Sequence, residues 1–127
     1  MLSSLDGVDT SRIAVQGQSA GGALAAGVTL LARDRSGPAI CFQVLEIPVL
    51  DDRLDTPSMR AHVATPLWSA PQAETSWRLY LGGREADQYI APARAEDLSE
   101  LPSAYVLTCE LDPLRDEGIQ YLSLIHI

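Results

Sequence analysis

The sequence contains few cysteines, few aromatic residues and no excess of positive charge. Its 127 residues include 2 cysteines, and aromatic residues make up 6% of the chain. The formal net charge is −8, from 17 acidic and 9 basic residues, so the chain has no basic patch for nucleic acid or for an anionic membrane. We therefore expect neither of these as a partner.

The few cysteines also limit the possible chemistry. Cys41 and Cys109 both lie in apolar, strand-like runs, which predicts two buried, reduced thiols rather than a disulfide or a pair of ligands. No spacing typical of a metal site is present. No apolar run is long enough to span a membrane, and the first six residues do not resemble a signal peptide, so we expect a cytoplasmic location.

The most informative segment is Val15-Gln16-Gly17-Gln18-Ser19-Ala20-Gly21-Gly22. Residues 12–16 before it are typical of a strand, and residues 20–33 after it are rich in alanine and leucine at helical spacing. A serine between glycines at such a strand-to-helix turn is typical of a nucleophile elbow, in which the serine backbone is strained. An ordinary glycine turn is the alternative, but the order of strand, turn and helix favours the elbow.

The elbow assigns a role to each neighbour of Ser19. Glycine at positions 17 and 21 would remove Cβ atoms that have no room beside the sharp turn. The backbone N–H of Ala20, at the positive end of the following helix, would point to the place where an oxyanion forms. These features predict acyl transfer at Ser19.

The remaining segments predict an α/β fold with a mainly parallel sheet. Small residues in 20–33 predict a helix that approaches the sheet closely and is almost wholly buried. The near-continuous apolar run 39–49 is typical of a central parallel strand covered on both faces. Residues 50–101 are interrupted by prolines and hold most of the aromatics, which predicts an irregular, lid-like excursion with short helices.

Side chains of this excursion allow more than one interpretation. Trp68, Trp77 and Tyr80 either pack the excursion onto the core, the more common role, or line an apolar substrate pocket. His62 has no neighbours in sequence that would orient it as a base, so we expect a surface or capping residue.

Asp112 follows the apolar run 104–109, which is typical of a strand. Since functional groups gather at the carboxyl ends of parallel strands, Asp112 would lie along the same edge as Ser19. It can act as the acid of a catalytic triad or cap a helix that has Pro113 in its first turn. The order of serine before aspartate favours the triad acid.

Two motifs resemble the α/β-hydrolase fold, and within it the bacterial hormone-sensitive-lipase-like esterases. Gly17-Gln18-Ser19-Ala20-Gly21-Gly22 is similar to the family's Gly-Asp-Ser-Ala-Gly-Gly block. Asp112-Pro113-Leu114-Arg115-Asp116-Glu117-Gly118 is similar to its acid block, and is the more specific match. The resemblance implies a doubly wound sheet of the α/β-hydrolase type, truncated at both ends.

The sequence also departs from the family pattern. Gln18 replaces the family's usual aspartate beside the nucleophile, and the upstream His-Gly-Gly-Gly segment that completes the oxyanion hole is absent. The family's histidine follows the acid on a later loop, and His126 is too close to Asp112 for that role. We expect residues 1–121 to be part of a hydrolase domain and residues 122–127 to be a foreign or frame-shifted tail.

The resemblance implies a serine carboxylic-ester hydrolase that needs no cofactor. Ser19 would attack a small or medium apolar ester, and Asp112 would orient a histidine that lies outside this chain. A peptidase or amidase of the same fold, a binding protein that has lost its chemistry, and a truncated product without function are the alternatives. The sequence does not predict the oligomeric state.

Overall fold

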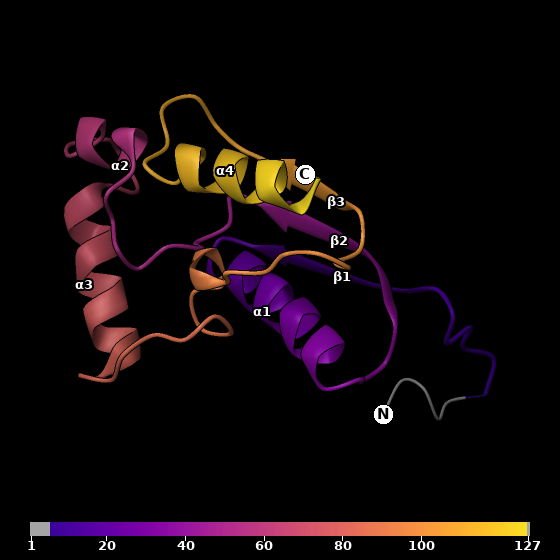
Figure 1. Cartoon of the computed structure of the whole chain (residues 1–127). Helices are drawn as coiled ribbons and strands as arrows, with labels where there is room; N and C mark the ends of the chain where they lie inside the picture. The colour runs from indigo at the N-terminus through magenta and orange to yellow at the C-terminus, as the bar shows by residue number, and fades with distance from the viewer. Residues whose placement is uncertain (1–5, 127) are drawn as a thin grey trace.

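The chain forms a three-stranded parallel sheet with helices packed against one face (Figure 1). In the computed structural model, which describes residues 6–126, the elements follow one another as β1 (Ile13–Gln18), α1 (Ala20–Asp34), β2 (Ile40–Glu46), α2 (Pro57–Ala61), α3 (Ala70–Leu81), η2 (Pro92–Arg94), β3 (Ala104–Leu107) and α4 (Arg115–Ile125). The strand order is β1-β2-β3, and β2 pairs in parallel with both neighbours. The predicted α/β class and the central parallel strand are confirmed.

The hydrophobic core lies between α1, α4 and this face of the sheet. Leu30 of α1, Leu45 of β2 and Tyr121 of α4 are all fully or almost fully buried and belong to one cluster. Leu50 and Leu98, at the two ends of the irregular excursion, join the same cluster. The excursion is therefore part of the core at both ends.

Helix α1 is only partly buried, so the prediction of an almost wholly buried helix is wrong. Leu24 is 58% exposed and Val28 is 49% exposed. These residues are four positions apart and therefore lie on one stripe of the helix, which the described residues leave about half exposed. The small residue Gly27 lets α1 approach the excursion closely, because a Cβ there would lie 2.2 Å from the carbonyl oxygen of Tyr89.

The second face of the sheet is not covered within the described residues. Tyr105 is 52% exposed and Leu107 is 40% exposed, and burial alternates along β1 and β3 with a period of two. The prediction that β2 is covered on both faces is therefore wrong. Its apolar sequence was equally compatible with one covered face, because apolar side chains also occur on exposed surfaces.

The predicted burial of both cysteines is also wrong. Cys41 and Cys109 are free and exposed. Cys41 is the extra residue of a β-bulge, since Ile13 pairs with Ile40 and Ala14 pairs with Phe42. Cys109 lies in the loop after β3, which ends at Leu107.

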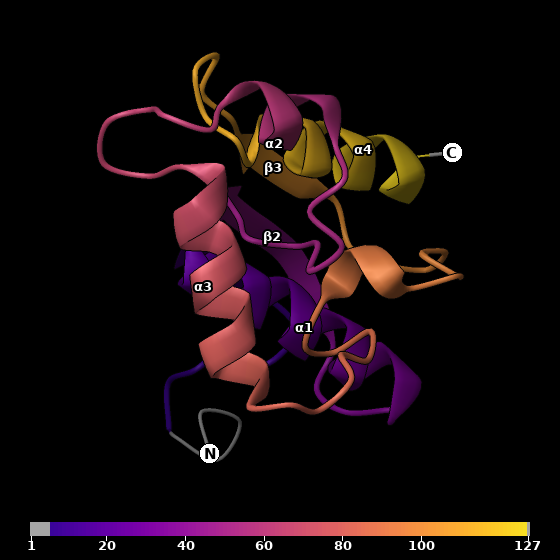
Figure 2. The same ribbon diagram turned by 90° about the vertical axis from the view of Figure 1, so that its left-hand side faces the viewer.

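Helices α2 and α3 lie beyond the carboxyl ends of the strands, where α3 faces the start of α1 and α2 lies beside α4 (Figures 1 and 2). They confirm the predicted short helices, while a lid function for residues 50–101 stays a prediction. His62 is the C-cap of α2, and its N–H donates to the carbonyl of Ser58 at 3.0 Å, as expected for a capping residue. Within residues 6–126, no helix combines the length and apolar character needed to cross a membrane.

Candidate active site

Ser19 is the single residue between β1 and α1. Its φ is 54° and its ψ is −121°, a conformation that costs a residue with a side chain about 1 to 3 kcal/mol. Backbone hydrogen bonds hold it there: its N–H donates to the carbonyl of Glu46 at 2.8 Å, and its carbonyl accepts the N–H groups of Gly22 at 2.9 Å, Val49 at 3.2 Å and Ala23 at 3.3 Å. The strained serine predicted for a nucleophile elbow is present.

The glycines around Ser19 differ in how much space a Cβ atom would have at their positions. A Cβ at Gly17 would lie 1.9 Å from the carbonyl oxygen of Gly21, so glycine is required at position 17, as predicted. A Cβ at Gly21 would meet nothing within 4 Å, so the prediction that this position also needs glycine is wrong. The second crowded position is Gly22, where a Cβ would lie 2.8 Å from the Cβ of Pro48. Sequence reasoning missed that contact because it joins segments far apart in the chain.

An apolar pocket of about 330 Å³ opens beside Ser19. Its lining combines the elbow and α1 with side chains from the excursion: Ser19, Ala20, Ala23, Leu24, Val49, Trp68, Ser76, Trp77 and Tyr80. The rings of Trp77 and Tyr80 lie 6.0 Å apart at an interplanar angle of 56°. Trp77 is also buried, and Trp68 packs on the cluster of Met59, Ala73 and Leu114. Trp68 and Trp77 therefore both pack the excursion and line the pocket, whereas the half-exposed Tyr80 lines the pocket.

Ala20 begins α1 and lines the same pocket. The first amides of a helix have no partner within the helix, and they carry its positive dipole end. The Ala20 N–H thus suits the role of an oxyanion donor predicted from the sequence.

Asp112 lies in the turn between β3 and α4. Its Oδ1 accepts the N–H of Leu114 at 2.9 Å, and its carbonyl accepts the N–H of Arg115 at 3.1 Å. Helix α4 begins only at Arg115, so Pro113 stands in the preceding turn and not in the first helical turn. The Oδ2 atom makes no hydrogen bond with any described residue. One carboxylate oxygen therefore shapes the turn, and the other remains for a further partner.

The sheet brings Ser19 and Asp112 to the same edge. The last residues of the three strands are in register, with Gln18 paired to Glu46 and Glu46 paired to Leu107. Ser19 directly follows Gln18, and the loop after Leu107 leads to Asp112. A serine at a strained elbow after β1, an apolar pocket beside it and a carboxylate after β3, two strands along the sheet, are the arrangement that a serine hydrolase uses for its nucleophile and its acid.

Comparison with known proteins agrees with this arrangement. The family model described as alpha/beta hydrolase fold matches residues 2–126. The chain belongs to this family.

Relatives of this alpha/beta hydrolase are named as esterases. Esterase LipI of Mycobacterium tuberculosis is 40% identical over 124 residues, which cover 94% of this chain and 38% of that protein. An arylesterase of Saccharolobus solfataricus is 40% identical over 119 residues, covering 91% of this chain and 38% of that protein. The solved structure of a bacterial heroin esterase is 53% identical with a TM-score of 0.90, covering 95% of this chain and 41% of that one. The resemblance found in the two motifs is confirmed, and the chain spans about two fifths of the length of these relatives.

Neither His62 nor His126 lines the pocket. His62 caps α2, and His126 caps the opposite end of α4 from Asp112, where its Nδ1 lies 2.9 Å from the carbonyl oxygen of Leu122. The 11 residues of α4 separate the two ends by about 16 Å. This placement agrees with the exclusion of His126 as the partner of Asp112.

Sequence reasoning missed two buried polar side chains, Ser58 and Glu117, that hold the Asp112 turn and the start of α4 in place. The buried side chain of Ser58 donates to the carbonyl of Pro113 at 2.8 Å and accepts the N–H of Asp116 at 3.0 Å. The carboxylate of Glu117 is buried and accepts the N–H of Leu50 at 2.6 Å. The acid motif contains Asp116 and Glu117, but only the fold identifies their partners.

Proposed function

We propose that the protein to which this chain belongs is a carboxylic-ester hydrolase that forms an acyl-enzyme on Ser19. The observation that carries the proposal is the strained Ser19 at the rim of an apolar pocket, since that conformation has no structural benefit of its own. The names of the relatives reported above, which are an esterase, an arylesterase and a heroin esterase, support the ester as the substrate class.

In the proposed reaction, the Oγ of Ser19 attacks the ester carbonyl carbon while a histidine from outside this chain takes its proton. Asp112 orients that histidine through its free oxygen and stabilises the cation. The negative oxygen of the tetrahedral intermediate accepts a hydrogen bond from the Ala20 N–H. The intermediate collapses with loss of the alcohol, which receives the proton from the histidine. Water then attacks the acyl-serine, giving the free acid and restoring Ser19.

The pocket supports small to medium apolar groups on the ester. Its lining is almost entirely apolar, so it favours burial of a hydrocarbon or aromatic group and disfavours a charged one. No part of this reaction calls for a cofactor. The cytoplasmic location and the absence of a nucleic-acid partner stay predictions.

The test is turnover of p-nitrophenyl butyrate by the full-length protein, meaning a protein that contains residues 1–127 together with the expected histidine. Ser19→Ala should lower turnover by about 10⁴ to 10⁶. Ser76→Ala is the matched control, because it removes a hydroxyl that lines the same pocket without touching the elbow, and it should leave turnover within about threefold of wild type. Equal turnover of Ser19→Ala and wild type would overturn the proposal.

A second comparison separates the ester hydrolase from a peptidase or amidase. We expect p-nitrophenyl butyrate to be cleaved and the corresponding p-nitroanilide to be cleaved far more slowly. Preferred cleavage of the anilide would favour the amidase. Residues 1–127 alone should be a poor esterase, because Ser19 lacks a base.

A further inference from the structure

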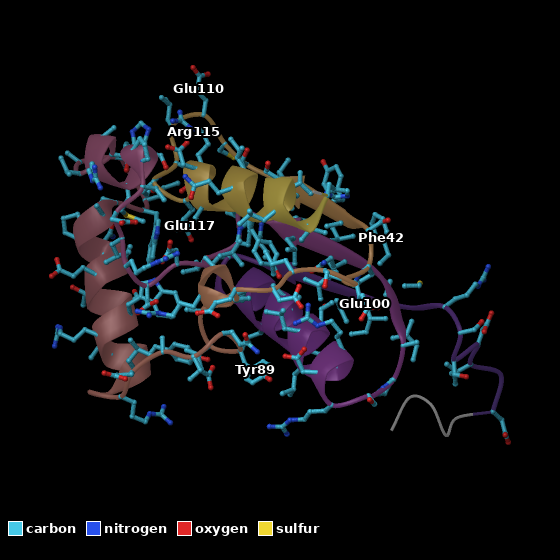
Figure 3. All side chains as sticks on the ribbon, in the orientation of Figure 1. Phe42, Tyr89, Glu100, Glu110, Arg115 and Glu117 are labelled. Atoms are coloured by element: carbon cyan, nitrogen blue, oxygen red, sulfur yellow. The ribbon has the colours of Figure 1, made fainter. Side chains whose placement is uncertain are left out.

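Glu117 is a buried carboxylic acid that the proposed reaction does not use. It lies in the first turns of α4, is 2% exposed, and points from the helix toward the interior, whereas Glu110 points away from the molecule (Figure 3). Its Oε1 accepts the N–H of Leu50 at 2.6 Å and lies 3.4 Å from the N–H of Asp51. Its Oε2 is buried without a hydrogen-bond partner among the described residues. Burial of a carboxyl group with an unpaired oxygen costs free energy, so its presence at this position calls for an explanation.

The segment that Glu117 holds also supports the nucleophile. Val49, the residue before Leu50, donates its N–H to the carbonyl of Ser19 at 3.2 Å and lines the substrate pocket. Pro48 packs against Gly22 at the start of α1. Two adjacent amides therefore point to different partners: the Val49 amide bonds to the elbow, and the Leu50 amide bonds to Glu117.

Glu117 also connects to Asp112, because both belong to the stretch that leads into helix α4. Glu117 lies five positions after Asp112, on the first turns of the helix that the Asp112 turn begins. The backbone from the Asp112 turn into α4 is further held by Ser58, through the carbonyl of Pro113 and the N–H of Asp116. A displacement of α4 would therefore carry Asp112 with it.

We propose that Glu117 is a positioning residue that fixes Asp112 relative to Ser19 by joining α4 to the segment that supports the elbow. The proposal rests on the proposed function, in which both residues act on one histidine. The path is short: Asp112 and Glu117 share one rigid stretch, Glu117 binds Leu50, and Val49 binds Ser19. Since an error of about 1 Å in a catalytic geometry can cost about 100-fold in rate, such a link affects turnover directly.

The charge state of Glu117 suits this role. Burial raises the pKa of Glu117 to about 8, the amides of Leu50 and Asp51 oppose that rise, and the negative charges of Asp51 and Asp112 add to it. The carboxyl group is thus mostly neutral near pH 7. A neutral Glu117 holds the amides without placing a second negative charge beside Asp112.

The kinetic test uses the full-length protein and three variants. Glu117→Gln keeps an oxygen that can accept the Leu50 amide, Glu117→Ala removes it, and Tyr121→Phe is the matched control. Tyr121 lies one turn further along α4 with a buried hydroxyl that has no partner among the described residues. The rate is expressed per Ser19 that reacts with an organophosphate inhibitor, so that a loss of folded protein does not lower it.

We expect Glu117→Ala to lower kcat per reactive serine by about tenfold or more while KM changes less than about twofold. Glu117→Gln should stay within about threefold of wild type, and Tyr121→Phe should be unchanged. Should Glu117→Ala fail to fold, Glu117→Asp replaces it, because the shorter side chain weakens the same contact. An unchanged kcat per reactive serine in the variant that folds would overturn the proposal.

A second measurement does not depend on catalysis and so separates this proposal from the proposed function. Amide hydrogen exchange is measured at Val49 and Leu50 in wild type, Glu117→Gln and Glu117→Ala (or Glu117→Asp). Faster exchange of both amides in the Ala or Asp variant, restored in Glu117→Gln, supports the link to Ser19, even if Ser19→Ala leaves ester turnover unchanged. Faster exchange at Leu50 alone would show that the effect of Glu117 does not extend to Val49 and Ser19, and it would overturn the proposal.

Discussion

The N–H of Val49 donates to the carbonyl oxygen of Ser19 at 3.2 Å, so the segment after β2 supports a residue between β1 and α1. The strained backbone of Ser19 is thereby held from outside its own strand and helix. This contact explains how the elbow keeps a conformation that costs about 1 to 3 kcal/mol. The stability of the elbow depends on the close packing of three chain segments.

Alanine at positions 17 and 21 should have opposite consequences. In Gly17→Ala the new methyl group would lie 1.9 Å from the Gly21 carbonyl oxygen, which forces the elbow to move. We expect a loss of about 3 kcal/mol or more in the free energy of unfolding, together with loss of ester turnover. Gly21→Ala is the matched control, since its methyl group meets open space and alanine favours the helix, so stability should change by less than about 1 kcal/mol. Urea unfolding of both variants checks this, and equal losses would contradict it.

Asp112→Asn in the full-length protein should separate the two roles of this side chain. The asparagine oxygen can still accept the Leu114 amide, so the free energy of unfolding should change by no more than about 1 kcal/mol. Turnover should fall by about 10⁴, because the amide favours the wrong histidine tautomer.

The chain offers a matched control for that substitution. Asp97 accepts the N–H of Ser99 in the same kind of turn, at 2.8 Å, on the surface. Asp97→Asn should leave both turnover and stability unchanged. Near-normal turnover of Asp112→Asn would remove Asp112 from the catalytic group and make Asp116 the next carboxylate to test.

The stability of the protein should depend on pH through Glu117. Its pKa is raised from 4.5 to about 8 on folding, so between these values the folded state binds the proton more tightly than the unfolded state. The stabilisation is fully present below about pH 4.5 and is lost as pH rises through about 8. Relative to Glu117→Gln, which does not titrate, wild type should lose on the order of 3 kcal/mol between about pH 5.5 and 8.5.

Urea unfolding of wild type and Glu117→Gln at both pH values measures this difference. A constant difference between the two proteins across this range would show that Glu117 is ionised in the folded state.

Residues 1–127 by themselves should bind a hydrophobic dye. Tyr105 and Leu107 are exposed on the same face of β3, where no described element covers them. The double variant Tyr105→Thr, Leu107→Thr keeps residues that favour strands and should lower dye fluorescence. Leu67→Ser is the control, because Leu67 is exposed singly in a loop and should contribute little. Equal dye binding by all three proteins, or none by wild type, would contradict this prediction.

The local sequence predicted the elements that carry the site. The strand before Ser19, the helix after it and the need for glycine at position 17 all follow from contacts within a few residues, which a local pattern records. The acid turn at Asp112 is of the same kind, since its side chain bonds to an amide two positions away. The surroundings of β2 and α1 could not be predicted in this way, because an apolar side chain is compatible with either a covered or an exposed face.

The sequence by itself indicated the family and the parallel sheet, and it predicted Ser19 and Asp112 as the residues that act on an ester. Tertiary structure alone decided which groups surround them. Trp77 reaches the pocket because α3 lies beyond the strand ends, and Glu117 reaches Leu50 across 67 positions in the chain. The physical reason is that backbone geometry and turn chemistry act between neighbours. The burial of a charge and the partner of an amide depend instead on segments that meet only after the chain has folded.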